Sequence, residues 1–343
     1  MGSMRRRNLL LGVLGAATGA GGMSACSTGG SPAGSGTVAP TATPGSPPPV
    51  PSSAAPILAS TTASSLAPRE VTPYTPPSGS APAQAYAVGR RDMTFTRGDR
   101  PLPTRVWYPA TGLPGVPDPV VDAEPAAGRL FPLVLFSHGL TATPESYADI
   151  LSRWAQAGFV VAAPAYPHTS YGVRDFQPSD IVNQPEDASY VLDQLLGMGD
   201  PLRAIIDPAR LGAAGHSGGG ITTVGLFSAV RDARLKAGVV FAGTDFRGLP
   251  FAGPPAAMLY VHGRRDKTVA WQAGHTVFEA TPWSRAMLSI TEGGHVTEPG
   301  DLAPTAGTTT EFLRWALYGD TTARDRIPAA AALQGVATLE NQL

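Results

Sequence analysis

Short apolar runs alternate with segments of helical periodicity from residue 133 to residue 318. The apolar runs are Leu133–Phe136, Phe159–Ala163, Leu211–Ala214, Gly238–Phe241, Met258–Val261 and Ala286–Ile290. The segments whose spacing favours helices are Pro144–Ala157, Pro185–Leu196, Ser217–Val230, Val269–Ala280 and Thr308–Tyr318. Runs without polar alternation indicate strands buried on both faces, and their alternation with helices indicates a mostly parallel sheet covered by helices.

Two further segments, Ala87–Thr96 and Leu102–Tyr108, alternate in polarity and are joined by a polar turn. Such a pair indicates an antiparallel hairpin. The turn contains an Arg-Gly-Asp tripeptide, but a Gly-Asp turn before a proline accounts for it without an adhesion partner. The predicted fold is therefore α/β, with a mostly parallel central sheet, an N-terminal antiparallel hairpin and helices on both faces.

The composition changes sharply before this hairpin. Residues 27–85 consist almost wholly of Ser, Thr, Ala, Gly and Pro, and such a segment cannot bury enough apolar surface to offset the entropy lost on ordering. We therefore expect a disordered linker there. The expected organisation is an expression remnant with an export signal at 1–26, the linker at 27–85, one folded domain at 86–320 and a C-terminal tail at 321–343.

The N-terminal segment has the features of an export signal. Arg5–Arg7 precede the apolar run Leu9–Ala17, which is too short to span a bilayer, and small residues follow up to Cys26. Arg6-Arg7 resembles the start of a twin-arginine signal, and Ser24-Ala25-Cys26 resembles the end of a bacterial lipobox, whose cysteine is diacylated. We therefore expect an exported lipoprotein anchored to the membrane through Cys26. An ordinary cleaved signal with an incidental cysteine, which would give a secreted protein, is the alternative.

Charge, cysteine content and missing motifs argue against several classes of protein. The formal net charge is -1, which argues against the broad basic surface that nucleic-acid binding requires. A single cysteine excludes an internal disulfide and a cysteine-rich metal site. The sequence also lacks the common nucleotide-binding and zinc-protease motifs. We therefore expect neither a cofactor nor a metal ion.

A glycine-rich turn carries the first candidate for chemistry. The apolar run that ends at Ala214 leads directly into Gly215-His216-Ser217-Gly218-Gly219, which opens a helical segment. A strand that enters a helix through Gly-x-Ser-x-Gly holds the serine oxygen above the sheet in a tight turn. Ser217 is therefore the candidate nucleophile. The backbone N–H groups of Gly218 and of Leu140, which follows the first parallel strand, are candidate donors to an oxyanion.

A serine nucleophile needs a histidine to take its proton and a carboxylate to orient that histidine. In this arrangement both residues follow the serine along the chain, in loops after later strands. Of the six histidines, His295 follows both the serine and a candidate acid at a strand end. Asp266 is the candidate acid, and Asp245, one strand earlier, is the alternative.

These motifs together resemble one branch of the α/β-hydrolases. Ser137-His138-Gly139, Gly215–Gly219, His262-Gly263-x-x-Asp266 and Gly294-His295 are similar to the dienelactone-hydrolase-like branch, which also resembles platelet-activating-factor acetylhydrolases and, more distantly, cutinase-like polyester hydrolases. The resemblance implies the α/β-hydrolase fold for residues 86–320. True dienelactone hydrolases carry a cysteine nucleophile, whereas this chain has Ser217, which favours esterase chemistry through an acyl-enzyme.

The sequence thus predicts a serine hydrolase that cleaves a carboxylic ester, from a small molecule, a lipid or a polyester. A non-catalytic binding protein on the same scaffold, or an acyltransferase or peptidase with the same triad, remains open. Aromatic residues and a histidine near the expected site are candidates for substrate contact: Trp271, His216, Phe246 and Tyr171.

Overall fold

The computed structural model describes residues 71–115, 118–295, 299–332 and 335–343. The predicted export signal, the lipidation site at Cys26 and most of the predicted linker lie outside these residues and stay predictions. Among the described residues, no helix is both long enough and apolar enough to cross a bilayer.

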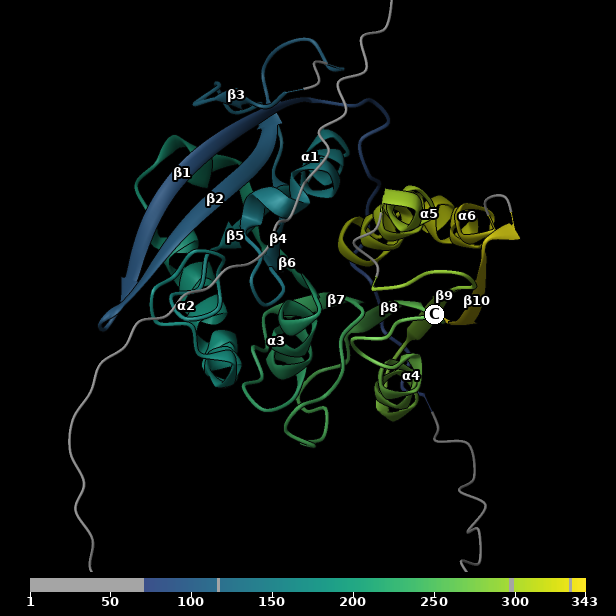
Figure 1. Cartoon of the computed structure of the whole chain (residues 1–343). Helices are drawn as coiled ribbons and strands as arrows, with labels where there is room; N and C mark the ends of the chain where they lie inside the picture. The colour runs from purple at the N-terminus through teal and green to yellow at the C-terminus, as the bar shows by residue number, and fades with distance from the viewer. Residues whose placement is uncertain (1–70, 116–117, 296–298, 333–334) are drawn as a thin grey trace, which may run out of the picture. The chain divides into compact units, whose positions relative to one another are not determined.

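One mixed sheet forms the centre of the described residues (Figure 1), with the strand order β10-β9-β8-β7-β6-β4-β5-β2-β1-β3. The strands from β4 to β9 run parallel, whereas β2 and β10 each pair antiparallel with their neighbours. The strands are β1 (Ala87–Arg97), β2 (Arg100–Ala110), β3 (Val120–Val121), β4 (Phe131–Ser137), β5 (Val160–Pro164), β6 (Ile206–His216), β7 (Leu235–Phe241), β8 (Ala257–Gly263), β9 (Arg285–Ile290) and β10 (Ala337–Gln342).

Helices cover both faces of this sheet (Figure 1). They are the short 3-10 turns η1 (Pro144–Tyr147), η2 (Pro178–Val182) and η3 (Pro201–Ile205), the π-helical turn η4 (Arg314–Tyr318), and the α-helices α1 (Ala148–Gln156), α2 (Gln184–Gly197), α3 (Gly218–Phe227), α4 (Trp271–Ala280), α5 (Pro299–Leu313) and α6 (Thr321–Ala331). Helices α1, α5 and α6 contribute to one buried cluster, and α2, α3 and α4 to another. Because side chains alternate along a strand, Val134 and Phe136 enter the first cluster and Leu133 and Leu135 the second.

The predicted fold class is confirmed. The hairpin and all six apolar runs form strands, and each predicted helix is present with shifted ends. The largest difference within the helices is the last one, because helical structure begins at Pro299 and not at Thr308. Continuous burial of β4, β5, β8 and β9 is the reason that the apolar pattern identified the parallel strands.

The segment 321–343 is part of the fold, which corrects its prediction as a tail. Asp320 caps α6 by accepting a hydrogen bond from the amide of Ala323, and Ala323 and Ile327 are buried on the sheet. Strand β10 then pairs antiparallel with β9 along its whole length. The short strand escaped prediction because only one of its residues, Leu339, is a large apolar side chain.

Residues 71–85, here called the N-terminal strap, are likewise fixed in place, which corrects the predicted linker boundary at residue 85. The Tyr74 amide donates to Ser284 Oγ at 3.0 Å, and its buried hydroxyl donates to the Ala316 carbonyl at 2.9 Å. Further along the strap, the amide of Ala81 donates to Asp320. The strap therefore packs against β9, η4 and the start of α6, not into solvent.

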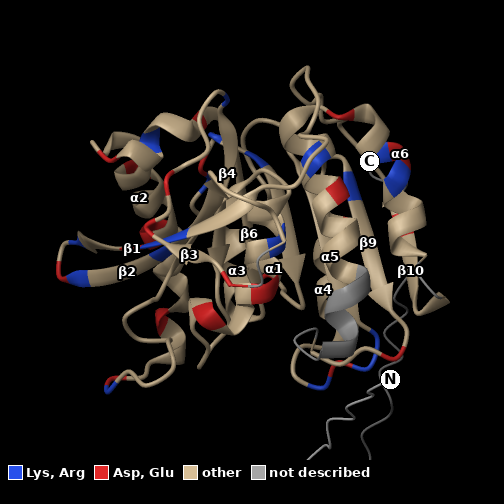
Figure 2. Cartoon of the chain, turned by 90° about the horizontal axis from the view of Figure 1, so that it is seen from above, with Lys and Arg blue, Asp and Glu red and all other residues tan. Residues whose placement is uncertain are grey.

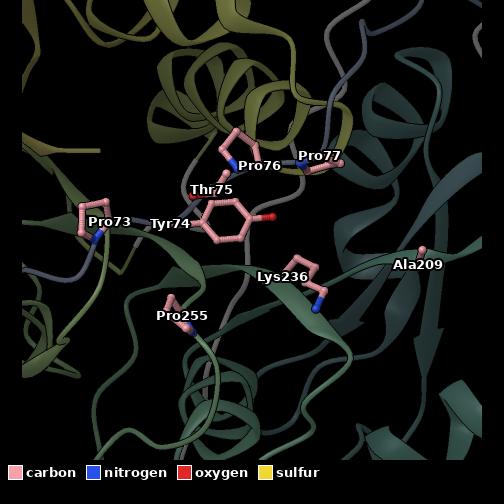
Figure 3. Close-up of a pocket in the computed structure, with 8 residues that line it drawn as sticks. All are labelled: Pro73, Tyr74, Thr75, Pro76, Pro77, Ala209, Lys236 and Pro255. Atoms are coloured by element: carbon pink, nitrogen blue, oxygen red, sulfur yellow. The ribbon is translucent and has the colours of Figure 1, made fainter.

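The strap also borders a cavity of about 430 Å³ (Figure 3). Pro73, Pro76 and Pro77 form one side, and Lys236 at the start of β7 faces them. Ala209 and Pro255, near the beginnings of β6 and β8, complete the lining. This cavity lies at the amino ends of the parallel strands, whereas the predicted catalytic residues follow their carboxyl ends.

Candidate active site

The predicted site residues come together at the carboxyl edge of the sheet. Leu140 follows β4, Ser217 follows β6, Asp266 follows β8 and His295 follows β9. Because these strands are parallel neighbours in one sheet, the loops after them open on the same edge. This is the edge where α/β folds bind their ligands.

Ser217 occupies a strained turn between β6 and α3, as the sequence pattern predicts. Its backbone angles are φ 54° and ψ -116°, a conformation that a residue with a side chain rarely adopts. Its amide donates to the Phe241 carbonyl at 2.9 Å, which ties the turn to β7. A Cβ on Gly219 would collide with the Ser137 carbonyl, so the tight turn requires glycine at that position.

Asp266 and His295 form the second part of the site. His295 Nδ1 and Asp266 Oδ2 are 2.7 Å apart, and the Asp266 side chain is fully buried. The other oxygen, Oδ1, accepts the amides of Thr268 at 2.8 Å and Val269 at 2.9 Å. The carboxylate is thereby held in one orientation. With its proton on Nδ1 toward Asp266, the neutral His295 ring has its lone pair on Nε2.

His216 connects this pair to the serine turn. Its Nε2 lies 2.8 Å from the backbone carbonyl oxygen of His295, and the two imidazole rings are 4.7 Å apart between centroids. His216 directly precedes Ser217 in the chain. The histidine loop after β9 and the serine turn after β6 are therefore in contact, and residues 217 and 295 lie on the same side of the molecule.

The loop after β4 places the amide of Leu140 near the serine turn. Within residues 139–142, Gly139 donates to Tyr147 Oη, Thr141 donates to the Thr169 carbonyl and Ala142 donates to the Gly139 carbonyl. In the described residues this leaves the Leu140 amide without a protein acceptor. A Cβ built on Gly218 would lie 3.3 Å from the Leu140 nitrogen. The two predicted oxyanion donors are therefore close neighbours.

The buried side-chain amide of Gln184 connects the loop after β4 with helix α3. Gln184 Nε2 donates to Thr169 Oγ1 at 2.7 Å, and Gln184 Oε1 accepts from Thr222 Oγ1 at 2.5 Å. Thr169 accepts the Thr141 amide of the β4 loop, and Thr222 lies on α3. Gln184 thus joins the two elements that carry the oxyanion donors. Sequence reasoning missed it, because a glutamine at a helix start carries no motif.

An ion cluster fixes the turn η2 beside the site. The Arg100 guanidinium binds the buried carboxylates of Asp180 at 2.7 Å and Asp187 at 2.6 Å. Burial alone would raise the pKa of Asp180, but hydrogen bonds from Arg100 and Asn183 lower it. Ile181, next to Asp180, lies 3.1 Å from a Cβ built on Gly218. Figure 2 shows acidic and basic residues along the β1–β2 hairpin, whereas the charged residues of α2 are all acidic.

Three histidines at this edge, His138, His216 and His262, are buried, and burial lowers the pKa of each. Burial lowers the pKa of His138 to about 4. The pKa of His216 is also lowered to about 4, first by burial and then by the nearby His295. His138 accepts the Tyr166 amide on Nε2 at 3.2 Å and has its Nδ1 2.7 Å from the Gly139 carbonyl. The His138 ring therefore helps to hold the loop after β4 in place.

The four predicted substrate contacts have different environments. His216 is buried with both ring nitrogens bonded within the protein, which favours positioning over substrate contact. The Trp271 indole donates to Ser289 Oγ at 2.9 Å and packs against Arg264. These contacts favour a packing role for Trp271.

The other two aromatic candidates are exposed. Phe246 lines a small groove with Ile181 and Ile221, next to the serine helix α3. Tyr171 borders a different cavity, beside the β1–β2 hairpin. Asp245, the alternative acid, lines the groove of Phe246, whereas His295 Nδ1 is bonded to Asp266. Among the described residues, no group of three or more His, Cys, Asp or Glu side chains could hold a metal ion.

The sheet order and the strand–turn–helix at Ser217 show that the chain has an α/β-hydrolase fold. Among solved structures, it is similar to a ferulic acid esterase from Streptomyces cinnamoneus, with a TM-score of 0.59 and 22% sequence identity over 80% of this chain and 100% of that one. At that identity the likeness concerns the fold.

Sequence comparisons find similarity to chlorophyllases and to a protein named as an esterase. The family model for chlorophyllase matches residues 91–245, which include the β4 loop and Ser217 but end before Asp266. The chain is 30% identical over 135 residues to the Bacillus subtilis (strain 168) protein named "Putative esterase YitV", covering 38% of this chain and 51% of that protein. It is 31% identical over 116 residues to chlorophyllase-1 of Citrus sinensis, covering 33% of each. The chain thus spans about half or less of the length of these curated relatives.

Proposed function

We propose that the protein is a serine hydrolase of carboxylic esters, with Ser217 as nucleophile, His295 as general base and Asp266 as the residue that orients the base. The observation that carries this proposal is the 2.7 Å contact between His295 Nδ1 and the buried Asp266 carboxylate, beside a serine at φ 54°. Relatives named as esterases and chlorophyllases support an ester substrate.

In the first half of the reaction, Ser217 Oγ attacks the ester carbonyl carbon while its proton moves to His295 Nε2. The oxyanion that forms accepts hydrogen bonds from the amides of Leu140 and Gly218. The tetrahedral intermediate then collapses, and the alcohol leaves with the proton from His295. Ser217 is now acylated.

In the second half, water attacks the acyl-enzyme and gives its proton to His295. The second tetrahedral intermediate releases the carboxylic acid and returns the proton to Ser217. The sum is one ester and one water converted to one acid and one alcohol. Asp266 stays ionised throughout and stabilises the imidazolium.

The decisive test is the substitution Ser217→Ala. Wild-type protein is expected to hydrolyse p-nitrophenyl butyrate and to react covalently with a fluorophosphonate probe. The variant is expected to lose labelling, and its kcat is expected to fall by on the order of a millionfold, as for the loss of such a nucleophile in a comparable triad. Ser228→Ala is the matched control, because Ser228 follows the same helix and donates only to the Val224 carbonyl.

Two results would redirect the proposal. Folded wild-type protein that neither labels nor hydrolyses esters would favour a binding protein on a hydrolase scaffold. If the protein labels but transfers its acyl group mainly to an added alcohol or amine, product analysis would identify an acyltransferase. Equal turnover by Ser217→Ala and wild type would refute the mechanism.

A further inference from the structure

A chain of hydrogen bonds links three loops at the candidate active site. The Gly139 amide donates to Tyr147 Oη at 3.1 Å, in the loop after β4 that carries Leu140. Tyr147 Oη lies 2.8 Å from His216 Nδ1, in the serine turn. His216 Nε2 lies 2.8 Å from the His295 carbonyl oxygen, in the loop of the candidate base. We call these three bonds the Tyr147–His216 relay.

The groups at the two ends of the relay fix the positions of the hydrogens within it. The Gly139 amide can only donate, so Tyr147 Oη accepts there and directs its own hydrogen to His216 Nδ1. At the other end, the His295 carbonyl can only accept, so His216 Nε2 must carry the ring proton. In a neutral His216 ring the lone pair is then on Nδ1, where it accepts the hydrogen of Tyr147 Oη, and the proton is on Nε2.

The surroundings keep both side chains in these states. Tyr147 is 7% exposed and His216 is 5% exposed. Burial raises the pKa of Tyr147 to about 12, and burial with the nearby His295 lowers the pKa of His216 to about 4. Packing also leaves little freedom, since a Cβ on Gly139 would lie 3.1 Å from His216 Nδ1 and 3.2 Å from Tyr147 Oη.

We propose that Tyr147 and His216 are positioning residues, which hold the His295 loop and the Leu140 loop in register with Ser217. The inference rests on the proposed ester hydrolysis. The contacts support this inference for the Leu140 amide and for the His295 backbone. Because Tyr147 engages the Gly139 amide, Leu140 supplies the next amide of the loop for an oxyanion. Because His216 holds the His295 backbone, the base is fixed at its main chain as well as at its ring by Asp266.

Because the relay positions the reacting groups, its loss is expected to lower kcat more than it changes KM. In Tyr147→Phe the hydroxyl is lost, so that the Gly139 amide and His216 Nδ1 lose their partner and both loops are freed. We expect kcat for p-nitrophenyl butyrate to fall by about 10 to 100-fold, since a displacement near 1 Å can cost on the order of a hundredfold. KM is expected to change little, and the rate of fluorophosphonate labelling is expected to fall in parallel with kcat.

Tyr260→Phe is the matched control. Tyr260 is a buried tyrosine whose hydroxyl lies 2.6 Å from Thr281 Oγ1, and it takes no part in the relay. Both substitutions remove one buried hydroxyl, so a general loss of stability would affect both variants alike. Wild-type kcat in Tyr260→Phe, together with a low kcat in Tyr147→Phe, is the expected result.

Two substitutions at His216 separate its hydrogen bond from its volume. His216→Gln keeps an N–H donor that can reach the His295 carbonyl, whereas His216→Leu has none. We expect His216→Gln to retain more of the wild-type kcat than His216→Leu, at similar KM. Equal losses in the two variants would contradict positioning through this bond.

The possible outcomes distinguish the relay from the proposed function. Normal kcat in Tyr147→Phe, while wild type hydrolyses esters and Ser217→Ala does not, would overturn the relay alone. Absence of hydrolysis and labelling in wild type would overturn the proposed function. If Tyr147→Phe does not fold, ¹⁵N NMR of wild-type histidine side chains decides instead. At pH 7 a neutral His216 protonated on Nε2 supports the relay, and a charged or Nδ1-protonated ring overturns it.

Discussion

The carboxyl and amino edges of the central sheet differ in backbone strain and in the side chains that are buried there. At the carboxyl edge, Ser217 has a positive φ, and His138 and His216 are buried without charge. At the amino edge, the prolines of the N-terminal strap border an open cavity, and Tyr74 is anchored by two hydrogen bonds of ordinary length. The first edge contains a strained serine and buried imidazoles, whereas the second contains the buried Tyr74 in ordinary hydrogen bonds.

This difference separates residues that serve chemistry from residues that serve stability. Strained backbone and buried imidazoles each cost folding free energy, and they persist only where the surrounding structure compensates. The strap joins β9, η4 and α6 by local packing, which stabilises the fold without touching the site. Changes at the carboxyl edge should therefore alter activity or the pH dependence of stability, and changes at the strap should alter stability alone.

After Ser217→Ala, the largest expected effect is that of Asp266→Asn at the carboxyl edge. An amide at this position would favour the wrong tautomer of His295, and kcat is expected to fall by roughly 10,000-fold, as for the equivalent change in a serine protease. Unfolding by urea should change far less than activity. Asp245→Asn is the comparison, because Asp245 is the alternative acid. A larger loss of kcat in Asp245→Asn than in Asp266→Asn would reverse the assignment.

The next effect is a loss of stability in mild acid. For His138 and His216 the pKa is about 4 in the folded protein, against an ordinary 6.5. The unfolded chain therefore binds more protons between these values, so this stability is complete above pH 6.5 and is lost as pH falls toward 4. Each histidine can contribute about 3 kcal/mol over the whole interval.

Urea unfolding at pH 7.5 and pH 5 measures this dependence. In His138→Gln the decrease in unfolding free energy between these two pH values should be smaller than in wild type, because one of the three buried imidazoles with a lowered pKa (His138, His216 and His262) is gone. The strap contributes nothing here, since Tyr74 is the only side chain in residues 71–85 that can ionise. Equal stability of wild type at both pH values would contradict the burial of these neutral rings.

The smallest effect is expected at the strap, for Tyr74→Phe. The variant loses the hydrogen bond to the Ala316 carbonyl, which is expected to cost about 1 kcal/mol and to lower Tm by about 2 °C. Ester hydrolysis should be unchanged, since β9 separates Ser284, which binds Tyr74, from the His295 loop by about 20 Å. A marked fall in kcat without a change in Tm would show that the two edges are coupled.

Much of the carboxyl edge could be predicted from local sequence. Gly215–Gly219 specifies a tight turn whatever surrounds it, because only glycine avoids collision with the neighbouring backbone. The parallel strands are buried on both faces, so their apolar runs are visible without knowledge of their partners. Chain order then distinguished Asp266 and His295 from the other acids and histidines.

Other parts of the site could not be predicted, because their partners are remote in sequence. Tyr147 looks like an ordinary apolar position of a helix, and its role depends on His216, 69 positions away. Gln184 joins residues that lie 15 and 38 positions from it. No local pattern marks these side chains, since a hydrogen bond between distant segments leaves no periodicity in either segment.

The sequence by itself determined the α/β architecture, the serine turn and the order of the candidate triad, because each depends on local spacing or on glycine at a fixed place. The tertiary structure alone decided that the strap and the final strand β10 belong to the fold, and that His216 lies buried between Tyr147 and His295. The strap has the same composition as the segment before it. Its contacts with Ser284, Ala316 and Asp320 place it in the fold.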